Sequence, residues 1–443
     1  MKKKRLITTF LVLTLFTISS SVYADNENST LISADAGILM DAETGQVLYE
    51  KNMHKKEYPA SITKIMTILL GVESNRTQEN IVMSRNAVFS IPRDSAHIAL
   101  DEGEEIQLED ALYGAMLPSA NEACNGIAEH LSGSVSEFAK LMNQRAVSAG
   151  AQNTHFANPN GLHDPNHQTT AYDMAMITRD ALKNPDFRKI FGTTSYQIPP
   201  TNKQSEIRYL WTTHRMLKES EFYYEKAIGG KTGYTTEALN TLVTVANNGD
   251  RELIVVLLRN HSGRSNYNDT KALFEYGFNS FNSANLSNAE LLNSYPETEK
   301  DYELVSNTLI SNLQKSNFLL YKKLTDSDVS VKFENFSSLE NAKEFTYSVN
   351  LKEDSSFMYK NIGSISFKIE NPKPISKNIF SKLKFEPSSI LSIILKIIIF
   401  VVIALVIIYF YVNRNYYRKR ILKKYKKSKN KKLNPSRKKR EIM

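Results

Sequence analysis

The segments that decide the fold are Lys226-Ala-Ile-Gly-Gly-Lys231, Leu239-Asn-Thr-Leu-Val-Thr-Val-Ala246 and Glu252-Leu-Ile-Val-Val-Leu-Leu258. Each is a short run rich in aliphatic or β-branched residues, and turn-forming residues lie between the runs, which predicts strands. The second and third are joined by Asn247-Asn-Gly-Asp250, a combination typical of a tight hairpin turn. We therefore expect these three segments to form an antiparallel meander.

Helical patterns lie on both sides of this meander. Before it, Ser134-Val-Ser-Glu137 and Thr170-Ala-Tyr-Asp173 have the spacing of N-terminal helix caps, and Pro118 separates two further helices. The expected helices cover residues 61–73, 107–117, 121–131, 172–182 and 269–281, and an expected hairpin covers 36–40 and 46–50. Helices before and after an antiparallel sheet predict an α+β domain at residues 25–282.

The two ends of the 443-residue chain predict export and anchoring. Residues 2–5 are basic, residues 6–18 are apolar, and Val22-Tyr23-Ala24 fits a cleavage site. This predicts a signal peptide at residues 1–24, with an uncleaved anchor as the alternative. Residues 390–412 are mostly apolar and as a helix would be about 35 Å long, enough to cross a bilayer. We expect a single transmembrane helix there.

The charge distribution predicts the orientation of the chain. Residues 413–443 contain fifteen Lys/Arg and one acidic residue, whereas residues 25–389 carry a formal net charge of −10 within a chain of +9. Basic segments next to a span stay in the cytoplasm, so we expect the body outside the cell membrane and the basic tail inside, on anionic lipid. The acidic body argues against nucleic-acid binding, and nucleic-acid binding by the tail is the less favoured alternative.

Residues 283–375 differ in pattern from the region before them. Polar and apolar residues alternate in 329–333, 345–350 and 364–369, which predicts short strands of a small β-rich domain without catalytic residues. Residues 376–389 are expected to link this domain to the membrane span. Cys124 is the only cysteine of the chain, which excludes an intrachain disulfide and a cysteine-cluster metal site.

The first chemical motif is Ser61-Ile-Thr-Lys64, at a predicted helix start. Positions i and i+3 share a helix face, so the motif places a hydroxyl beside an amine. The two can act as nucleophile and base when desolvation or a neighbouring cation lowers the pKa of the lysine. Alone the pattern is weak, because it recurs at Ser381, Ser428 and Ser436. A helix cap with a surface lysine is the alternative.

Two further motifs carry polar groups elsewhere in the chain. Ser119-Ala-Asn121 lies between two helices, where a hydroxyl and an amide can relay a proton and hold a substrate amide; a helix cap is the alternative. Lys231-Thr232-Gly233 ends the first strand of the meander. Glycine there permits close approach of a ligand, and the lysine and threonine can bind a carboxylate. A strand end followed by a turn is the alternative.

In this order, the three motifs match the active-site motifs of penicillin-binding proteins and β-lactamases, which form an acyl-enzyme on a serine. The strings around them resemble low-molecular-mass penicillin-binding proteins, and most closely the serine-type D-alanyl-D-alanine carboxypeptidases. These strings are Tyr58-Pro-Ala-Ser-Ile-Thr-Lys-Ile-Met-Thr67, Met116-Leu-Pro-Ser-Ala-Asn-Glu-Ala-Cys124, Asn158-Pro-Asn-Gly-Leu162 and Gly229-Gly-Lys-Thr-Gly-Tyr-Thr235. The resemblance covers residues 30–282 and extends to the β-rich domain and the anchor by architecture only.

The resemblance implies a penicillin-binding-protein/β-lactamase-like α+β domain, with an antiparallel sheet packed against helices. In such a domain Ser61 is the acylated nucleophile and Lys64 takes its proton. Ser119 and Lys231 would complete the proton relay to the leaving amine. These roles are implied by the family and are not read from the spacing alone.

The resemblance also implies the groups that bind the substrate. Asn121 would hold the peptide amide, and Thr232 the terminal carboxylate. The backbone N–H groups of Ser61 and Tyr234 would form the oxyanion hole, with Gly233 beside them in the substrate-binding strand.

The family has a carboxylate-binding arginine after the third strand, and here the sequence departs from its pattern. The aligned position is Asn266, while Arg264 lies two residues earlier and Arg259 ends the strand. We favour Arg264 for this role. Because of this departure, the resemblance leaves open how strictly the protein requires a substrate with a free C-terminal D-Ala.

The implied function is a membrane-anchored hydrolase that removes the terminal D-Ala from peptidoglycan stem peptides through a seryl ester. It needs no metal or organic cofactor, and β-lactams are expected to inhibit it covalently. A D,D-endopeptidase or transpeptidase on the same fold and an idle muropeptide-binding protein are the alternatives. A β-lactamase is less favoured, because its Glu-x-x-Leu-Asn string precedes Lys-Thr-Gly, whereas the similar Glu237-Ala-Leu-Asn240 follows it.

Four other residues have a plainer interpretation. His163 and His167 are four residues apart, but Asp164-Pro165 between them favours a loop over a zinc pair. Cys124 is expected to be a small buried residue. Trp211 could line a substrate groove, but we expect it to pack in the core.

Overall fold

The computed structural model describes residues 31–284, 286, 290–291, 309, 311–313, 315, 317–333, 344–352 and 361–368. The predicted signal peptide (1–24), linker (376–389), membrane span (390–412) and basic tail (413–443) lie outside these residues. Within them, no helix has the length and apolar character that crossing a bilayer requires.

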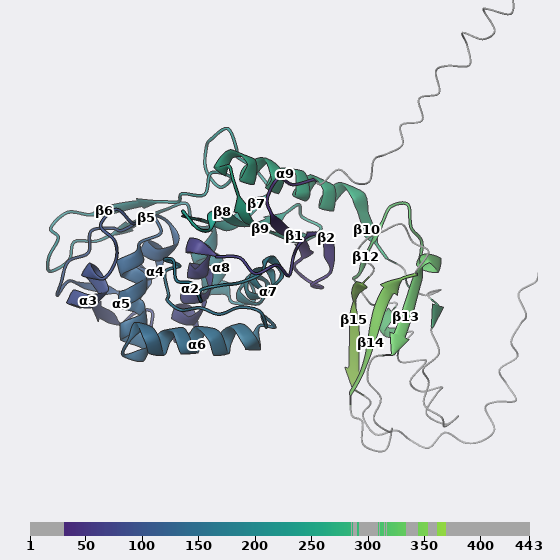
Figure 1. The fold of residues 1–443 in the computed structure, drawn as a ribbon, viewed down its shortest axis with the longest axis horizontal. Coiled ribbons are helices and arrows are strands. Elements are labelled where there is room, and N and C mark those ends of the chain that lie inside the picture. Colours follow the sequence, from purple (N-terminus) through teal and green to yellow (C-terminus); the bar gives the residue numbers. More distant parts are fainter. Residues whose placement is uncertain are drawn as a thin grey trace, which may run out of the picture. The chain divides into compact units, whose positions relative to one another are not determined.

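The part of the chain that precedes the β-rich region is built on a five-stranded antiparallel sheet (Figure 1). The three predicted strands form its meander, as β7, β8 and β9. The predicted hairpin near the N-terminal end adds β1, which pairs with β9, and β2, which pairs with β1. The strand order is β2 (Val47–Lys51), β1 (Ala36–Asp41), β9 (Glu252–Asn260), β8 (Leu239–Asn247) and β7 (Ala227–Thr235). β7, the first strand of the meander, continues four residues beyond its predicted end at Lys231. Lys231, Thr232 and Gly233 therefore lie inside β7.

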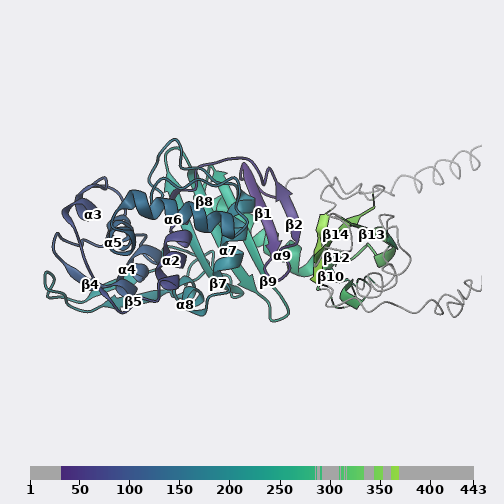
Figure 2. The ribbon, with the colours of Figure 1, turned by 90° about the horizontal axis from the view of Figure 1, so that it is seen from below.

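Helices cover both faces of this sheet, which explains why β9 is apolar at every position from 253 to 258 (Figure 2). Its side chains alternate between two cores. Ile254, Val256 and Leu258 pack with the helices that precede the meander, and Leu253, Val255 and Leu257 pack with α9. This arrangement confirms the predicted α+β class.

Most helices begin and end close to the predicted positions. Thr170 and Ser134 accept hydrogen bonds from Asp173 N and Glu137 N, as the cap signals predicted. The helices are α2 (Lys64–Glu73), α3 (Arg85–Phe89), α4 (Leu108–Met116), α5 (Asn121–Ser132), α6 (Val135–Ser148), α7 (Ala171–Ala181), α8 (Pro185–Gly192) and α9 (Gly263–Ser280). The predicted start of α9 at residue 269 is wrong, because Ser262 caps the helix by accepting a bond from Ser265 N.

Two short antiparallel strand pairs escaped the sequence patterns. One pairs β3 (Asn80–Val82) with β4 (Glu105–Gln107), and the other pairs β5 (Ser195–Ile198) with β6 (Arg208–Trp211). Strands this short carry too few residues for a clear alternation of polar and apolar positions.

The predicted strands of the β-rich region are present. A four-stranded sheet contains β11 (Glu290–Leu291), β13 (Val329–Phe333), β14 (Glu344–Leu351) and β15 (Asn361–Lys368). Val329, Val331 and Val349 belong to a core of its own. A separate pair joins β10 (Phe281–Ser283) to β12 (Leu319–Tyr321), and a 3-10 turn, Asp326–Asp328, precedes β13.

Candidate active site

Ser61 lies in a single 3-10 turn, Ala60–Thr63, that leads directly into α2. The helix was expected to begin at Ser61 itself, and a 3-10 turn at a helix N-terminus accounts for the difference of three residues. Ala60 has a φ of 51°, which L-residues rarely adopt. The backbone is therefore held in an unusual conformation immediately before the serine.

Lys64 is completely buried, and its amine lies within reach of the serine. The Nζ atom is 3.0 Å from Ser61 Oγ, 2.7 Å from Asn121 Oδ1 and 2.5 Å from the carbonyl oxygen of Asn160. A neutral amine has two N–H groups and a lone pair. The two fixed acceptors, from Asn121 and Asn160, can take both N–H groups, which leaves the lone pair for the hydroxyl proton of Ser61.

The turn Asn158-Pro-Asn-Gly161 packs against the serine turn and fixes this geometry. The Pro159 carbonyl accepts a bond from Thr67 Oγ1 at 2.5 Å, and Asn160 Nδ2 donates to Asn125 Oδ1 at 3.0 Å. Gly161 has a φ of +84°, and a Cβ there would lie 1.9 Å from the Ala60 carbonyl oxygen. Only glycine fits at this position.

Ser119 and Asn121 come to the site from the break between α4 and α5. Ser119 has a φ of 72°, and the residue is buried. Among the residues that the structure describes, its Oγ atom has no hydrogen-bond partner. Buried hydroxyls are normally bonded, so this one is available to a group that enters from outside the protein. Asn121 begins α5 and contacts Lys64 through its amide oxygen.

Strand β7 brings Lys231, Thr232 and Gly233 alongside the serine turn. A Cβ at Gly233 would lie 2.8 Å from the backbone nitrogen of Ser61, so the strand approaches the turn as closely as glycine allows. Thr241 Oγ1, on the neighbouring strand β8, donates to the Pro59 carbonyl at 2.8 Å and ties the sheet to the turn. Lys231 is buried, and its Nζ donates to the Thr232 carbonyl at 3.0 Å.

Burial makes the charged form of both lysines unfavourable. It lowers the pKa of Lys64 from the ordinary 10.5 to about 8, against the opposing effect of Cys124 and Glu122. It also lowers the pKa of Lys231 well below the ordinary range, and the positive charge of Lys64 lowers it further. Two adjacent buried ammonium groups repel each other, so the site favours a neutral amine on one of them.

The remaining site residues, Thr232 and Tyr234, are less buried than Lys231 and Gly233 on the same strand. Thr232 Oγ1 is 2.9 Å from Thr213 Oγ1, which places two hydroxyls side by side. Tyr234 is 63% exposed. The structure thus brings Ser61, Lys64, Ser119, Asn121 and the Lys231–Tyr234 segment into one region.

A family model described as D-alanyl-D-alanine carboxypeptidase matches residues 23–262, more than half of the chain. The chain belongs to this family. It is a serine peptidase of the penicillin-binding-protein type, as the sequence motifs predicted.

Relatives and solved structures of this carboxypeptidase family agree with the assignment. The chain is 33% identical over 287 residues to the D-alanyl-D-alanine carboxypeptidase DacF of Bacillus subtilis, which covers 63% of this chain and 72% of that protein. It is similar to a Streptomyces DD-transpeptidase structure, with a TM-score of 0.52 and 28% identity over 56% of this chain and 97% of the other. It is also similar to a Mycobacterium tuberculosis D-alanyl-D-alanine carboxypeptidase structure, with a TM-score of 0.51 and 27% identity over 56% of this chain and 91% of the other.

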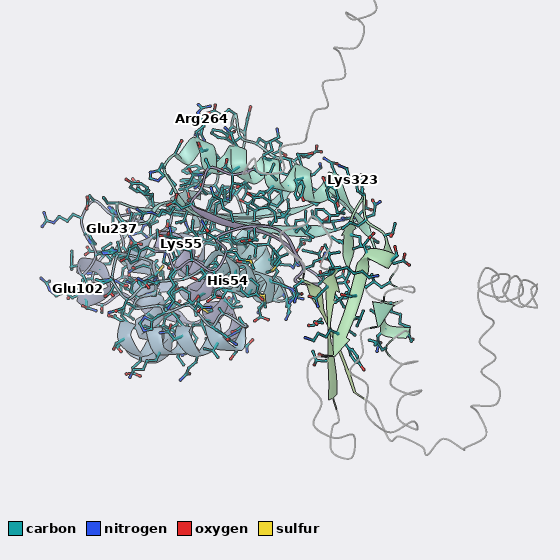
Figure 3. All side chains as sticks on the ribbon, turned by 45° about the vertical axis from the view of Figure 1, so that its right-hand side comes forward. His54, Lys55, Glu102, Glu237, Arg264 and Lys323 are labelled. Atoms are coloured by element: carbon teal, nitrogen blue, oxygen red, sulfur yellow. The ribbon has the colours of Figure 1, made fainter. Side chains whose placement is uncertain are left out.

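Arg264, favoured from the sequence as the carboxylate-binding arginine, lies in the first turn of α9 (Figure 3). Its guanidinium pairs with Glu221 at 2.8 Å and lies over the ring of Phe222. The side chain is 65% exposed. The aligned position, Asn266, is buried. Arg264 is therefore already paired with a neighbouring carboxylate, and its role in binding the substrate carboxylate stays a prediction.

The structure also shows where the other residues singled out in the sequence lie. Cys124 is buried as expected, and burial raises the pKa of its thiol to about 11. His167 is also buried; its Nε2 is 2.7 Å from Thr63 Oγ1, and its Nδ1 accepts from Ala157 N. His163 packs edge-on against Tyr58. The expectation that Trp211 packs in the core is wrong, because it is 60% exposed on an outward-facing position of β6.

The sequence analysis assigned no role to two contributors to the site. Asn160 supplies a carbonyl to Lys64, but its string, Asn158-Pro-Asn-Gly161, was quoted only for the family resemblance, although its turn character is visible in the sequence. Thr213 meets Thr232 from a segment 19 residues away, and no local pattern predicts that contact.

Proposed function

We propose that this carboxypeptidase removes the terminal D-Ala from peptidoglycan stem peptides, with Ser61 as the acylated residue. The observation that carries the proposal is the 3.0 Å contact between Ser61 Oγ and a buried lysine amine whose other two contacts are fixed acceptors. A buried amine of lowered pKa beside a serine hydroxyl is the arrangement that activates a seryl nucleophile.

Acylation would proceed in two stages. Neutral Lys64 takes the proton of Ser61, and the seryl oxygen attacks the carbonyl of the penultimate D-Ala. The developing oxyanion is bound by the backbone N–H groups of Ser61 and Tyr234. As the C–N bond breaks, the proton returns to the leaving amine through Ser119 and Lys231, and D-Ala departs. Water then hydrolyses the seryl ester and releases the shortened peptide.

Substrate binding in this proposal uses β7 and the start of α5. The Asn121 amide holds the peptide amide, Gly233 permits the peptide to approach the strand, and Thr232 binds the terminal carboxylate. Thr213, whose hydroxyl is 2.9 Å from that of Thr232, would add a second donor. β-Lactams carry an equivalent carboxylate and a reactive amide, and they would acylate Ser61 as substrate mimics.

The proposal is tested by release of free D-Ala from a pentapeptide ending in D-Ala-D-Ala. The purified chain is expected to release it, and Ser61→Ala is expected to be inactive with an unchanged circular dichroism spectrum. Product analysis with an added amino acceptor would separate hydrolysis from the transpeptidase alternative, which the similarity to the Streptomyces enzyme keeps open. A folded wild-type chain that releases no D-Ala would leave the idle binding protein as the better hypothesis.

The role of Arg264 predicts a change in substrate affinity. A charge-assisted bond to the substrate carboxylate contributes roughly 1.5–3 kcal/mol, so Arg264→Ala is expected to raise KM for the pentapeptide by about tenfold or more. We expect a contribution near the lower end of this energy range, because the guanidinium must leave Glu221 to reach the ligand. Steady-state kinetics measure this. An unchanged KM would move the carboxylate-binding role from Arg264 to Arg259 or to another group.

We also propose that the catalytic region faces the outside of the cell membrane, held by a span at 390–412 with the basic tail on cytoplasmic anionic lipid. The charge asymmetry between residues 25–389 and 413–443 supports this orientation. Protease added to intact cells is expected to remove the body and leave a fragment that carries a C-terminal tag. Full protection of the body would contradict the proposed topology.

A further inference from the structure

The carboxyl group of Glu122 is buried in the first turn of α5, directly after Asn121. Its Oε1 atom accepts a hydrogen bond from the backbone N–H of Ile98 at 2.7 Å and a longer one from that of Leu100 at 3.5 Å. The Oε2 atom is also buried, and among the described residues it has no hydrogen-bond partner. The acylation steps do not use this group, although a buried carboxylate is costly unless its charge is compensated.

Glu122 ties residues 96–100 to the part of the active site that carries Ser119 and Asn121. The backbone N–H of Asn121 donates to the Ala96 carbonyl at 2.8 Å, next to the two bonds that Glu122 accepts. The segment 96–100 is therefore held against the start of α5 by both a backbone and a side-chain contact. Loss of the carboxylate would release the side-chain contact at this point.

Three features favour the ionised form of Glu122 against the effect of burial. Burial raises the pKa of the carboxyl, whereas the N–H groups of Ile98 and Leu100 and the charge of His97 lower it. Hydrogen bonds to a carboxylate are stronger than those to a neutral acid. The first turn of a helix also stabilises an anion, because the positive end of the helix dipole lies there. These contacts suit a carboxylate better than a neutral carboxyl group.

The charge of Glu122 acts on the amine of Lys64, which contacts the neighbouring residue Asn121 at 2.7 Å. Burial lowers the pKa of Lys64, and Cys124 and Glu122 oppose this effect. The Cys124 thiol is neutral near pH 8, because burial raises its pKa to about 11. Of these two acidic groups, Glu122 is therefore the one that can carry a negative charge when Lys64 titrates.

The other titratable groups whose charges interact with Lys64 supply no negative charge. Lys231 on β7 is cationic or neutral, and burial lowers its pKa well below the ordinary range. His167, in the segment before α7, is neutral, because burial lowers its pKa to about 3. When Lys64 takes the proton of Ser61, it becomes a buried ammonium, which is unfavourable unless an opposite charge lies nearby. Among the described groups, Glu122 can supply that charge.

We propose that Glu122 is a positioning residue of the acylation step, whose carboxylate holds residues 96–100 against the start of α5 and stabilises the ammonium form of Lys64 that proton transfer produces. The inference rests on the proposed function, because it takes Lys64 as the base that deprotonates Ser61. It gives this base a buried counter-charge from outside the three motifs.

Glu122→Gln separates the charge from the hydrogen bonds. The amide oxygen of glutamine can accept the N–H groups of Ile98 and Leu100, but the side chain is uncharged. Without the negative charge Lys64 is a weaker base, so acylation by a fluorescent penicillin should be half-maximal roughly one pH unit below the wild-type midpoint. The limiting rate at high pH should also fall by a few-fold. A loss of packing alone would lower the rate and leave the midpoint in place.

Glu129→Gln is the matched control, because it removes one negative charge from the same helix about two turns away. Glu129 accepts bonds from Ser84 Oγ and Asn86 Nδ2 and lies outside the active site. This variant should keep the wild-type midpoint and limiting rate. Glu122→Ala should be slower than Glu122→Gln, and it should increase amide hydrogen exchange in residues 96–100, which Glu122→Gln keeps protected.

A direct titration of the Lys64 amine needs no acylation. The full Ser61→Ala chain is isotopically labelled at lysine Cε and followed by NMR, and the Lys64 signal is identified by its loss in Lys64→Arg. Adding Glu122→Gln should lower the midpoint of this signal by the same amount as that of the acylation rate. If the midpoint falls but the wild-type chain is not acylated by penicillin, the proposed function fails and the effect of Glu122 on Lys64 stands.

Three results would overturn the role of Glu122. An unchanged Lys64 midpoint in Glu122→Gln would show that this side chain places no charge near the amine. An equal shift in Glu129→Gln would make the effect one of net charge alone. Unchanged hydrogen exchange of residues 96–100 in Glu122→Ala would show that the carboxylate does not hold this segment.

Discussion

Lys64→Ala is expected to slow acylation by a fluorescent penicillin by roughly 10²–10⁴-fold, even though Ser61 is still present. The hydroxyl is a poor nucleophile without a base, and the structure places the Lys64 amine 3.0 Å from it. Lys64→Arg should not restore the rate, because a guanidinium stays protonated. The measurement is the second-order rate constant of labelling, with circular dichroism as the control for folding.

The pH dependence of acylation tests the same role without a substitution. Only the neutral amine can accept the proton, and burial lowers the pKa of Lys64 to about 8. The rate should therefore rise with pH and be half-maximal near pH 8, whereas an ordinary lysine would require about two pH units more. Two results would assign the role of base to another residue. One is an acylation rate that does not change between pH 6 and pH 9, and the other is labelling of the Lys64→Ala chain at the wild-type rate.

Gly161→Ala is expected to slow acylation by at least about 100-fold. The added Cβ would lie 1.9 Å from the Ala60 carbonyl oxygen and 3.0 Å from Ser61 N, so the serine turn must shift. A displacement of about 1 Å in a reacting group costs on the order of 10²-fold in rate. The same penicillin-labelling rate measures the effect.

Gly133→Ala is the matched control for Gly161→Ala. Gly133 has a φ of +78°, similar to the +84° of Gly161, but a Cβ there meets nothing within 4 Å. The control therefore carries the backbone cost of about 1–3 kcal/mol without the clash at the serine turn. It should lower thermal stability and keep the wild-type labelling rate. Wild-type labelling by Gly161→Ala would show that the turn tolerates displacement.

Much of the fold was predictable because its strong signals are local. β9 is a continuous apolar run, and Asn247-Asn-Gly-Asp250 encodes its turn to β8, so the meander followed from composition and turn residues. Ser134 and Thr170 predicted helix starts through side-chain caps that the structure contains. The start of α9 was misplaced because residues 263–268 are polar and lack helical periodicity, although Ser262 caps the helix.

The candidate site was predictable in its motifs and less so in its contacts. Ser61 and Lys64 are three residues apart, so their contact follows from helical spacing. The contact of Lys64 with the Asn160 carbonyl and that of Thr213 with Thr232 join segments distant in the chain, and they depend on packing that no local pattern encodes. Trp211 was misjudged for a related reason, because the four-residue strand β6 gave no indication of which face is buried.

The location of the covalent bond tests the central claim most directly. The full chain is exposed briefly to a penicillin, digested with trypsin and analysed by mass spectrometry. Cleavage after Lys56 and Lys64 gives a peptide of residues 57–64 that contains Ser61. We expect the mass of one penicilloyl group on Ser61 in this peptide, and none on a folded Ser61→Ala chain. A penicilloyl group on another residue, or stoichiometric labelling of Ser61→Ala, would contradict the assignment of Ser61 as the nucleophile.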